Sequence, residues 1–156
     1  MLQVYDGTHA WARDPRGTRD VPERMVSDLE AGLKRDTIAA LLAADAGRLR
    51  ARVLPDVKDE LNRSRHVVEL SGSDLDPMVL YIDPQTSRVV KQTYVAGGPG
   101  RPLIEEVFDD YRMVDGVSIA FTATVLVRGE PVLERRVLDI AIDRPLSPDL
   151  FKRPAS

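Results

Sequence analysis

Hydrophobic and polar residues alternate along most of the later two thirds of the chain, which is the pattern of β-strands with one buried face. The alternation is clearest over residues 117–127, where every odd position is apolar and most even positions are small or carry a hydroxyl group. Because no helix-length pattern separates the extended segments, we predict that they pair consecutively as one antiparallel meander. The segments are residues 48–54, 65–72, 78–83, 88–96, 102–112, 117–129 and 132–143.

The joints between these segments carry residues that favour turns. They are residues 83–87 (DPQTS), 97–100 (GGPG), 114–116 (VDG) and 128–131 (RGEP). Glycine, proline and aspartate at these joints support short hairpin connections, so the meander needs no crossover.

The chain before residue 50 follows a different pattern. Two short apolar stretches flank Asp6-Gly7, a dipeptide that accepts positive φ, so residues 2–15 are predicted to form a strand hairpin. Met25, Leu29 and Leu33 then recur at helical spacing and indicate a short amphipathic helix.

A second helix is predicted over residues 37–49, with Asp36 or Thr37 as its cap. It is rich in alanine and leucine, and its large apolar side chains are expected to face the sheet. These are Ile38, Leu41, Leu42 and Leu49. Two short helices beside a meander sheet give an α+β fold in one domain over residues 1–156.

The sheet has one fully hydrophobic face and a second face that is about half apolar. Two interpretations of the hydrophobic face follow. Its side chains fill a close-packed core, or they line an apolar cavity for a hydrophobic ligand. The two short helices are too few to cover seven strands, and this leaves the second interpretation open.

Composition and charge exclude some classes of protein. The 156 residues include 22 basic and 25 acidic side chains, so a net charge of -3 and a pI near 5.4 provide no drive toward nucleic acid. There is no cysteine, which excludes disulfides and thiolate metal sites. No segment approaches the roughly 20 apolar residues of a membrane span.

The sequence shows no catalytic constellation. His9 and His66 are far apart and fit no metal-binding spacing, so both are interpreted as surface or turn residues. The acidic stretches at 74–77 and 108–116 lack the alternate ligands and final glutamate of a calcium loop, and are interpreted as turn caps. We therefore expect a non-catalytic protein without metal or cofactor.

Four stretches in the same order resemble the outer-membrane lipoprotein-sorting (LolA-like) superfamily. They are VYDGTHAW near the start, LYIDPQTSRVVKQTYV in the middle, EEVFDDYRMVDGVSIAF, and the closing IAIDRPLSPDLFKRP. The resemblance implies a curved half-barrel sheet whose concave face is covered by two helices and receives acyl chains. Family members carry further strands and a helix before the first of these stretches, so the chain resembles the later part of the fold, and a longer parent chain is left open.

The resemblance places the binding of a lipid, acyl chain or lipoprotein on the apolar concave face. The ligand-binding residues expected from it are Trp11, Leu42, Leu80, Ile82, Ile119, Phe121 and Val125. Trp11 is expected to be half buried with its indole N–H in contact with water. A purely structural tryptophan under a loop is the alternative.

The resemblance also implies a periplasmic or cell-envelope location in a bacterium, with a hydrophobic ligand or an envelope protein as partner. Two other functions remain open. In the first alternative, the chain is an accessory C-terminal domain of an insulinase-like zinc peptidase of the envelope. In the second, it is an envelope-stress sensor that binds another protein. A further expectation is an exposed strand edge, which would allow two copies of the chain to pair as a homodimer.

Overall fold

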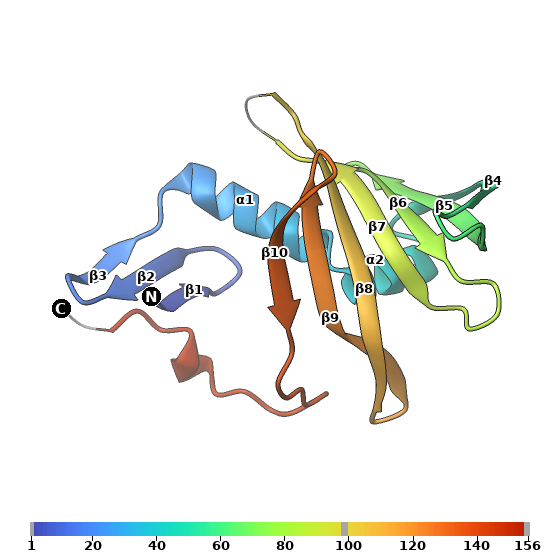
Figure 1. The fold of residues 1–156 in the computed structure, drawn as a ribbon. Helices are drawn as coiled ribbons and strands as arrows, with labels where there is room; N and C mark the ends of the chain where they lie inside the picture. The colour runs from blue at the N-terminus through green and yellow to red at the C-terminus, as the bar shows by residue number, and fades with distance from the viewer. Residues whose placement is uncertain (1, 98–99, 155–156) are drawn as a thin grey trace. The chain divides into compact units, whose positions relative to one another are not determined.

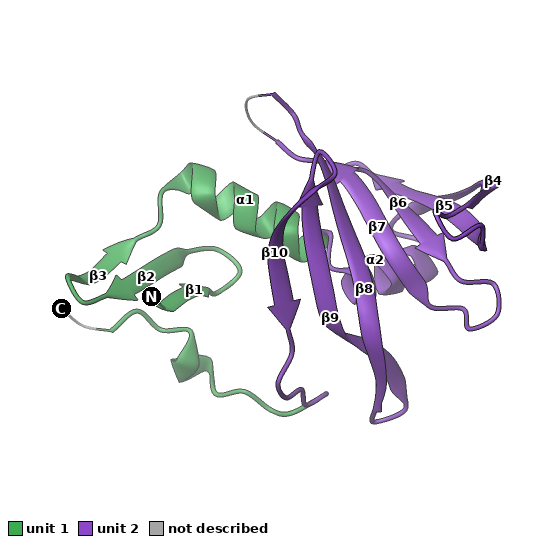
Figure 2. Cartoon of the chain, in the orientation of Figure 1, with its two compact units in different colours: residues 1–34, 143–156 green, residues 35–142 purple. Residues whose placement is uncertain are grey.

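The computed structural model describes residues 2–97 and 100–154, and the chain divides into two compact units. The first contains residues 1–34 and 143–156, and the second contains residues 35–142 (Figure 2). Of the joints expected from the sequence, the one at 97–100 includes residues 98 and 99, which lie outside the described residues.

A three-stranded antiparallel sheet forms the first unit, in the order β1-β2-β3 (Figure 1). The predicted hairpin is present, and the carboxylate of Asp6 accepts hydrogen bonds from the backbone N–H groups of Thr8 (2.8 Å) and His9 (2.7 Å). The third strand was not predicted. The bounds are Leu2–Tyr5 for β1, Ala10–Asp14 for β2 and Gly17–Asp20 for β3.

The first unit also contains the helix α1, Glu23–Lys34, and a 3₁₀ turn at Pro148–Leu150. Trp11 on β2 is only 6% exposed, and its indole N–H donates to the carbonyl oxygen of Phe151 at 3.0 Å. The expectation of a half-buried indole in contact with water is therefore wrong. The closing segment of the chain supplies the acceptor, which satisfies the N–H and allows the ring to be buried.

The second unit consists of α2, Thr37–Asp45, and a seven-stranded antiparallel sheet in the order β10-β9-β8-β7-β6-β5-β4 (Figure 1). The predicted meander and the α+β class are confirmed, because each strand pairs with its neighbours in sequence and the sheet does not close. The last strand is shorter than predicted. The bounds are Arg50–Lys58 (β4), Ser64–Gly72 (β5), Leu75–Ile82 (β6), Val89–Val95 (β7), Leu103–Val114 (β8), Val117–Val127 (β9) and Glu130–Arg136 (β10).

The turn between β8 and β9 shows why these two strands pair in their observed register. Val114 pairs with Val117, so only Asp115 and Gly116 lie between the strands. Both have positive φ, 47° and 85°, which is the geometry of a two-residue hairpin turn that matches the twist of the strands. An Asp-Gly dipeptide is well suited to this geometry, and the prediction of a turn here is confirmed.

Both edge strands of the large sheet contain a proline beside an irregularity in the ladder. In β4, Pro55 lies where the register shifts between Leu54 and Val57. In β10 the register shifts just after Pro131. Proline has no backbone N–H, and bulges interrupt the row of donors and acceptors, so neither edge presents a continuous ladder.

The helix α2 packs on the sheet through small side chains. Ala40 is buried in a cluster with leucine and methionine of β5 and β6, and Ala44 and Leu49 pack against the same cluster. Leu42 is 61% exposed, so the prediction that it faces the sheet is wrong, and Ile38 and Leu41 are exposed as well. Alanine lets the helix backbone approach the sheet closely. Because the alanine side of α2 faces the sheet, the larger side chains lie on the outer side of the helix.

A buried guanidinium joins two turns at one end of the sheet. Arg65 on β5 is 4% exposed, and it pairs with Asp59 at 2.8 Å and with Asp83 at 2.5 Å. Asp59 belongs to the β4–β5 connection, and Asp83 belongs to the turn after β6. Burial alone would raise the pKa of Asp59, but hydrogen bonds from the backbone and side chain of Arg63 and from Arg65 lower that pKa to about 2.

This shift predicts a loss of stability in acid. The pKa of Asp59 is about 2 in the folded chain, below the ordinary aspartate value of 3.8, so ionisation of Asp59 favours folding above pH 3.8. The contribution disappears as the pH falls from 3.8 toward 2. Urea unfolding at several pH values in this range should show the decline, and Asp59→Asn should reduce its slope. An equal slope in both proteins would contradict the assignment.

Candidate functional site

The register shows which residues share the face of the large sheet that α2 covers, which we call the α2 face. Directly paired residues of antiparallel strands lie on the same face. Leu80 pairs with Gln92, Gln92 with Glu106, and Glu106 with Val125, so these four residues form one row across β6, β7, β8 and β9. The row is apolar at both ends and polar in the middle.

Five of the seven predicted site residues lie on the α2 face. Leu80 has no exposed surface, Ile119 and Phe121 are buried, and Ile82 and Val125 are partly buried. The structure therefore brings these residues onto one surface, which extends from β6 to β9.

The other two predicted residues lie elsewhere. Leu42 is on the exposed side of α2, and Trp11 belongs to the first unit, where its indole N–H is bonded to a backbone carbonyl group. Sequence periodicity could not have separated them from the other five, because both are large apolar residues on predicted elements.

The polar middle of the α2 face holds the start of α2. The Thr37 hydroxyl donates to the side-chain oxygen of Gln92 at 2.8 Å, and the Gln92 amide N–H donates to the carbonyl oxygen of Arg35 at 3.3 Å. Asp36 caps the helix by accepting from two backbone N–H groups. Gln92 is buried, so these hydrogen bonds fix the beginning of α2 on β7.

A second polar cluster lies beside Gln92. The Tyr94 hydroxyl donates to a carboxylate oxygen of Glu106 at 3.3 Å, and Arg135 of β10 approaches Glu106 at 3.7 Å. The Arg35 guanidinium lies over the Tyr94 ring, 4.7 Å from its centroid. Burial and the neighbouring Glu106 carboxylate raise the pKa of Tyr94 to about 12, although Arg35 and Arg135 act in the opposite direction. Tyr94 is therefore a neutral donor at physiological pH.

Arg35 has an unusual environment within this cluster. Its Nε is buried without a hydrogen-bond partner, and no ion pair joins Arg35 to a described carboxylate. A buried donor left without a partner costs about 1–3 kcal/mol, so an acceptor brought to this position would stabilise the site. Arg35 was not among the residues expected from the sequence. The only signal was a basic residue immediately before the cap of an otherwise apolar helix.

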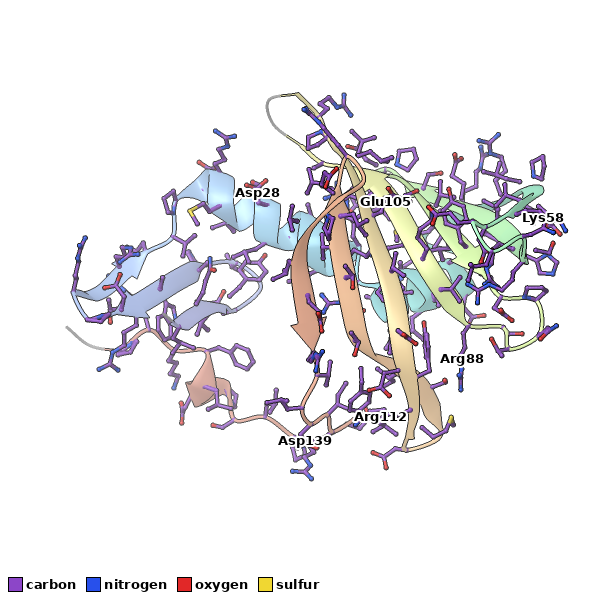
Figure 3. The ribbon with its side chains drawn as sticks, viewed as in Figure 1. Asp28, Lys58, Arg88, Glu105, Arg112 and Asp139 are labelled. Atoms are coloured by element: carbon purple, nitrogen blue, oxygen red, sulfur yellow. The ribbon has the colours of Figure 1, made fainter. Side chains whose placement is uncertain are left out.

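The opposite face of the sheet carries charged side chains that are paired or stacked. Lys91 lies over the Tyr81 ring at 4.4 Å and pairs at 3.1 Å with Glu105, which is labelled in Figure 3. Arg88 lies over the ring of Tyr111 at 5.0 Å. These stacked cations make part of this face charged, although Val67 and Thr93 on the same face are buried.

The acidic residues near the β8–β9 turn were interpreted from the sequence as turn caps, but Asp109 and Asp110 lie within β8, and of the three aspartates only Asp115 lies in the turn. Asp110 pairs at 2.5 Å with Arg112, which is labelled in Figure 3, and the Arg112 guanidinium lies over the Phe121 ring at 4.4 Å. Within residues 2–97 and 100–154, no group of three His, Asp or Glu side chains could hold a metal ion. In the same residues, no helix combines the length and the apolar character needed to cross a membrane.

The open antiparallel meander with one packed helix defines the class of this protein, an α+β curved-sheet fold. No protein-family model and no curated protein matches the sequence. The chain is similar in structure to a domain from Vibrio parahaemolyticus that is described as belonging to an outer membrane lipoprotein-sorting protein. The identity is 13%, the TM-score is 0.47, and the match covers 86% of this chain and 62% of that domain. The likeness is one of chain arrangement, and this chain spans less than two thirds of the domain it matches.

Proposed function

We propose that this chain binds the apolar part of a lipid, an acyl chain or a lipoprotein on the α2 face, without catalysis, in a bacterial envelope. One observation supports the proposal above all others. The helix that covers the most apolar part of this face contacts it through alanine, while Leu70, Met78 and Leu80 beneath it are almost completely buried.

This arrangement makes the part of α2 beyond Thr37 suitable for displacement by a ligand, while the hydrogen bonds of Gln92 hold the start of the helix. Burial of a methylene group contributes about 0.8 kcal/mol, so the alanine methyl groups of α2 lose little when the helix moves away from the sheet. The larger cost is exposure of Leu70, Met78 and Leu80, and an acyl chain lying on the sheet would cover them again. Ligand burial thus offsets the cost of opening.

The envelope location rests on the sequence motifs that resemble the lipoprotein-sorting superfamily. Two of the four motifs fall on the strands and turns that build the α2 face: the IDP-x-T motif ends β6, and the VDG motif joins β8 to β9. These two motifs therefore concern the same surface for which we propose binding, and the first and last motifs lie mainly in the first unit.

A second candidate function is recognition of another protein, as in the stress-sensor or peptidase-accessory alternatives. It is favoured by Ile38, Leu41 and Leu42, which are exposed along one side of α2 at helical spacing. The two functions use opposite sides of the same helix. The full reading frame would separate the peptidase alternative, because such a parent carries an HxxEH motif.

Binding of an uncharged fluorescent probe, N-phenyl-1-naphthylamine, tests the main proposal. The unmodified protein should bind the probe with increased emission, and Val125→Asp should weaken binding by about tenfold or more, because a carboxylate on the α2 face repels an apolar ligand. Thr124→Asp is the matched control, since Thr124 pairs with Val107 on the opposite face. Its affinity should remain that of the unmodified protein.

Two outcomes would contradict the proposal. The first is absence of probe binding by the unmodified, folded protein. The second is an equal loss of affinity in the Val125 and Thr124 variants, because the α2 face would then have no special role. Urea unfolding of both variants shows whether any loss of binding comes from unfolding.

A further inference from the structure

We propose that Arg35 receives the anionic head group, a carboxylate or a phosphate, of an amphiphile whose apolar chain lies on the α2 face. This inference rests on the proposed function and specifies the class of ligand. It assigns a role to Arg35, a residue outside the apolar set that the sequence indicated.

The partners of the stacked cations distinguish Arg35 from the others. Four cations lie over aromatic rings in the described residues of the second unit, and two of them have a carboxylate partner: Lys91 with Glu105 and Arg112 with Asp110. Arg35 and Arg88 have no such partner in the part of the chain that the structure describes. Of these two, Arg35 has a buried Nε without a hydrogen-bond partner.

The chemistry of the guanidinium defines what would complete this arrangement. Nε and one terminal nitrogen form a planar fork that matches the two oxygens of a carboxylate or phosphate. Stacking on Tyr94 holds the plane of the group, so little side-chain freedom is lost when an anion binds. An anion in the fork would supply the acceptor that Nε lacks.

The local charge also favours an anion. The charged side chains of this cluster are Arg35, Arg135 and Glu106, and the phenol of Tyr94 remains neutral. Two guanidinium groups face one carboxylate, so the cluster carries one excess positive charge. A monoanionic head group would neutralise it.

The position of Arg35 explains why the anion should belong to an amphiphile. Tyr94, beneath the guanidinium, pairs directly with Met78, and Gln92 pairs with Leu80. Met78 and Leu80 have no exposed surface and form the centre of the apolar cluster. The charged and apolar parts of the site therefore lie on neighbouring strands, side by side as the head and chain of one ligand are.

Isothermal titration calorimetry with three ligands of equal chain length tests the inference. The ligands are decanoate, decyl phosphate and decan-1-ol, each at a concentration below micelle formation. The unmodified protein should bind the two anions about tenfold or more tightly than the alcohol, because a charge-assisted, two-point contact replaces a neutral one. Inorganic phosphate alone should bind far more weakly than decyl phosphate, because it lacks the apolar chain.

Variants of Arg35 and Glu106 test the role of Arg35 most directly. Arg35→Met keeps a long side chain over Tyr94 but removes the fork. It should lower the affinity for the two anions to that for the alcohol, and the affinity for the alcohol itself should not change. Arg35→Lys should give an intermediate anion affinity, because the charge remains and the fork is lost. Glu106→Gln removes the competing carboxylate and should strengthen anion binding.

Arg88→Met is the matched control, because Arg88 also stacks on a tyrosine without a described carboxylate partner but does so over Tyr111. It should leave the affinities for all three ligands unchanged. Thermal unfolding of every variant confirms that the protein is folded at the temperature of the titration.

The results separate failure of this inference from failure of the proposed function. Equal affinity of the unmodified protein for the anions and the alcohol would overturn the role of Arg35 and leave binding of apolar chains intact. Equal weakening of all three ligands in Arg35→Met would also overturn it, because Arg35 would then act only by holding α2. Absence of binding for all three ligands would overturn both proposals.

Discussion

Replacing Leu80 with alanine should lower the free energy of unfolding by about 3–5 kcal/mol, as expected for a large-to-small change at a fully buried site. Leu80 has no exposed surface, and it packs in the cluster that joins α2 to β5 and β6. The loss combines the transfer of the removed atoms with the cavity they leave. Urea unfolding followed by circular dichroism measures it.

Leu42→Ala provides the control for this prediction. Leu42 is 61% exposed on α2, so its removal should change the free energy of unfolding by no more than about 0.5 kcal/mol. Leucine and alanine both favour helix, and the helix itself should persist. A loss in Leu42→Ala as large as that in Leu80→Ala would show that α2 packs through its leucine side in solution.

Replacing Arg65 with methionine should cost about 2–4 kcal/mol, because the change leaves two carboxylates without the buried charge that pairs with them. Arg65 is 4% exposed and joins Asp59 of one turn to Asp83 of another. Methionine fills much of the same volume, so the loss reports the ion pairs more than the packing. Chemical denaturation at pH 7 measures the effect.

Arg63→Met is the matched variant for Arg65. Arg63 also pairs with Asp59, at 2.8 Å, but its side chain is exposed. Water and salt screen such a pair, so its removal should have a much smaller effect than that of Arg65. Equal losses in the two variants would mean that burial of the Arg65 guanidinium contributes nothing.

The strands of the large sheet could be predicted from the sequence because each physical cue agreed with the others. Alternation placed Ile119, Phe121 and Ala123 on one buried side of β9, and the Asp-Gly turn determined how β9 pairs with β8. Consecutive segments joined by short turns have few other ways to pair. The five predicted site residues on the α2 face follow from this agreement.

The orientation of α2 could not be predicted in the same way. Its sequence, TIAALLAAD, is apolar on nearly every side, so periodicity does not distinguish the inner side from the outer one. Tertiary contacts decide which side of α2 faces the sheet. The Thr37 hydroxyl is hydrogen-bonded to Gln92, and Ala40 is small enough to fit between the helix and the sheet. Both depend on residues far from the helix in sequence.

The first unit shows the same limit. The strand β3 is Gly-Thr-Arg-Asp, with no apolar residue to alternate, and it exists because it pairs with β2. Trp11 finds its acceptor 140 residues further along the chain, at Phe151. Local patterns carry no information about a partner at that separation.

The interrupted edges of the large sheet bear on whether this fold can seed fibrils. Cross-β growth generally uses an uninterrupted segment of about six or seven residues. In β4 the regular ladder runs only over residues 50–54 before the shift at Pro55, and in β10 it runs only over residues 133–136 after the shift at Pro131. Each run is shorter than the segment that a growing fibril requires. Neither edge of the large sheet therefore offers a folded, uninterrupted run of this length on which another chain could add.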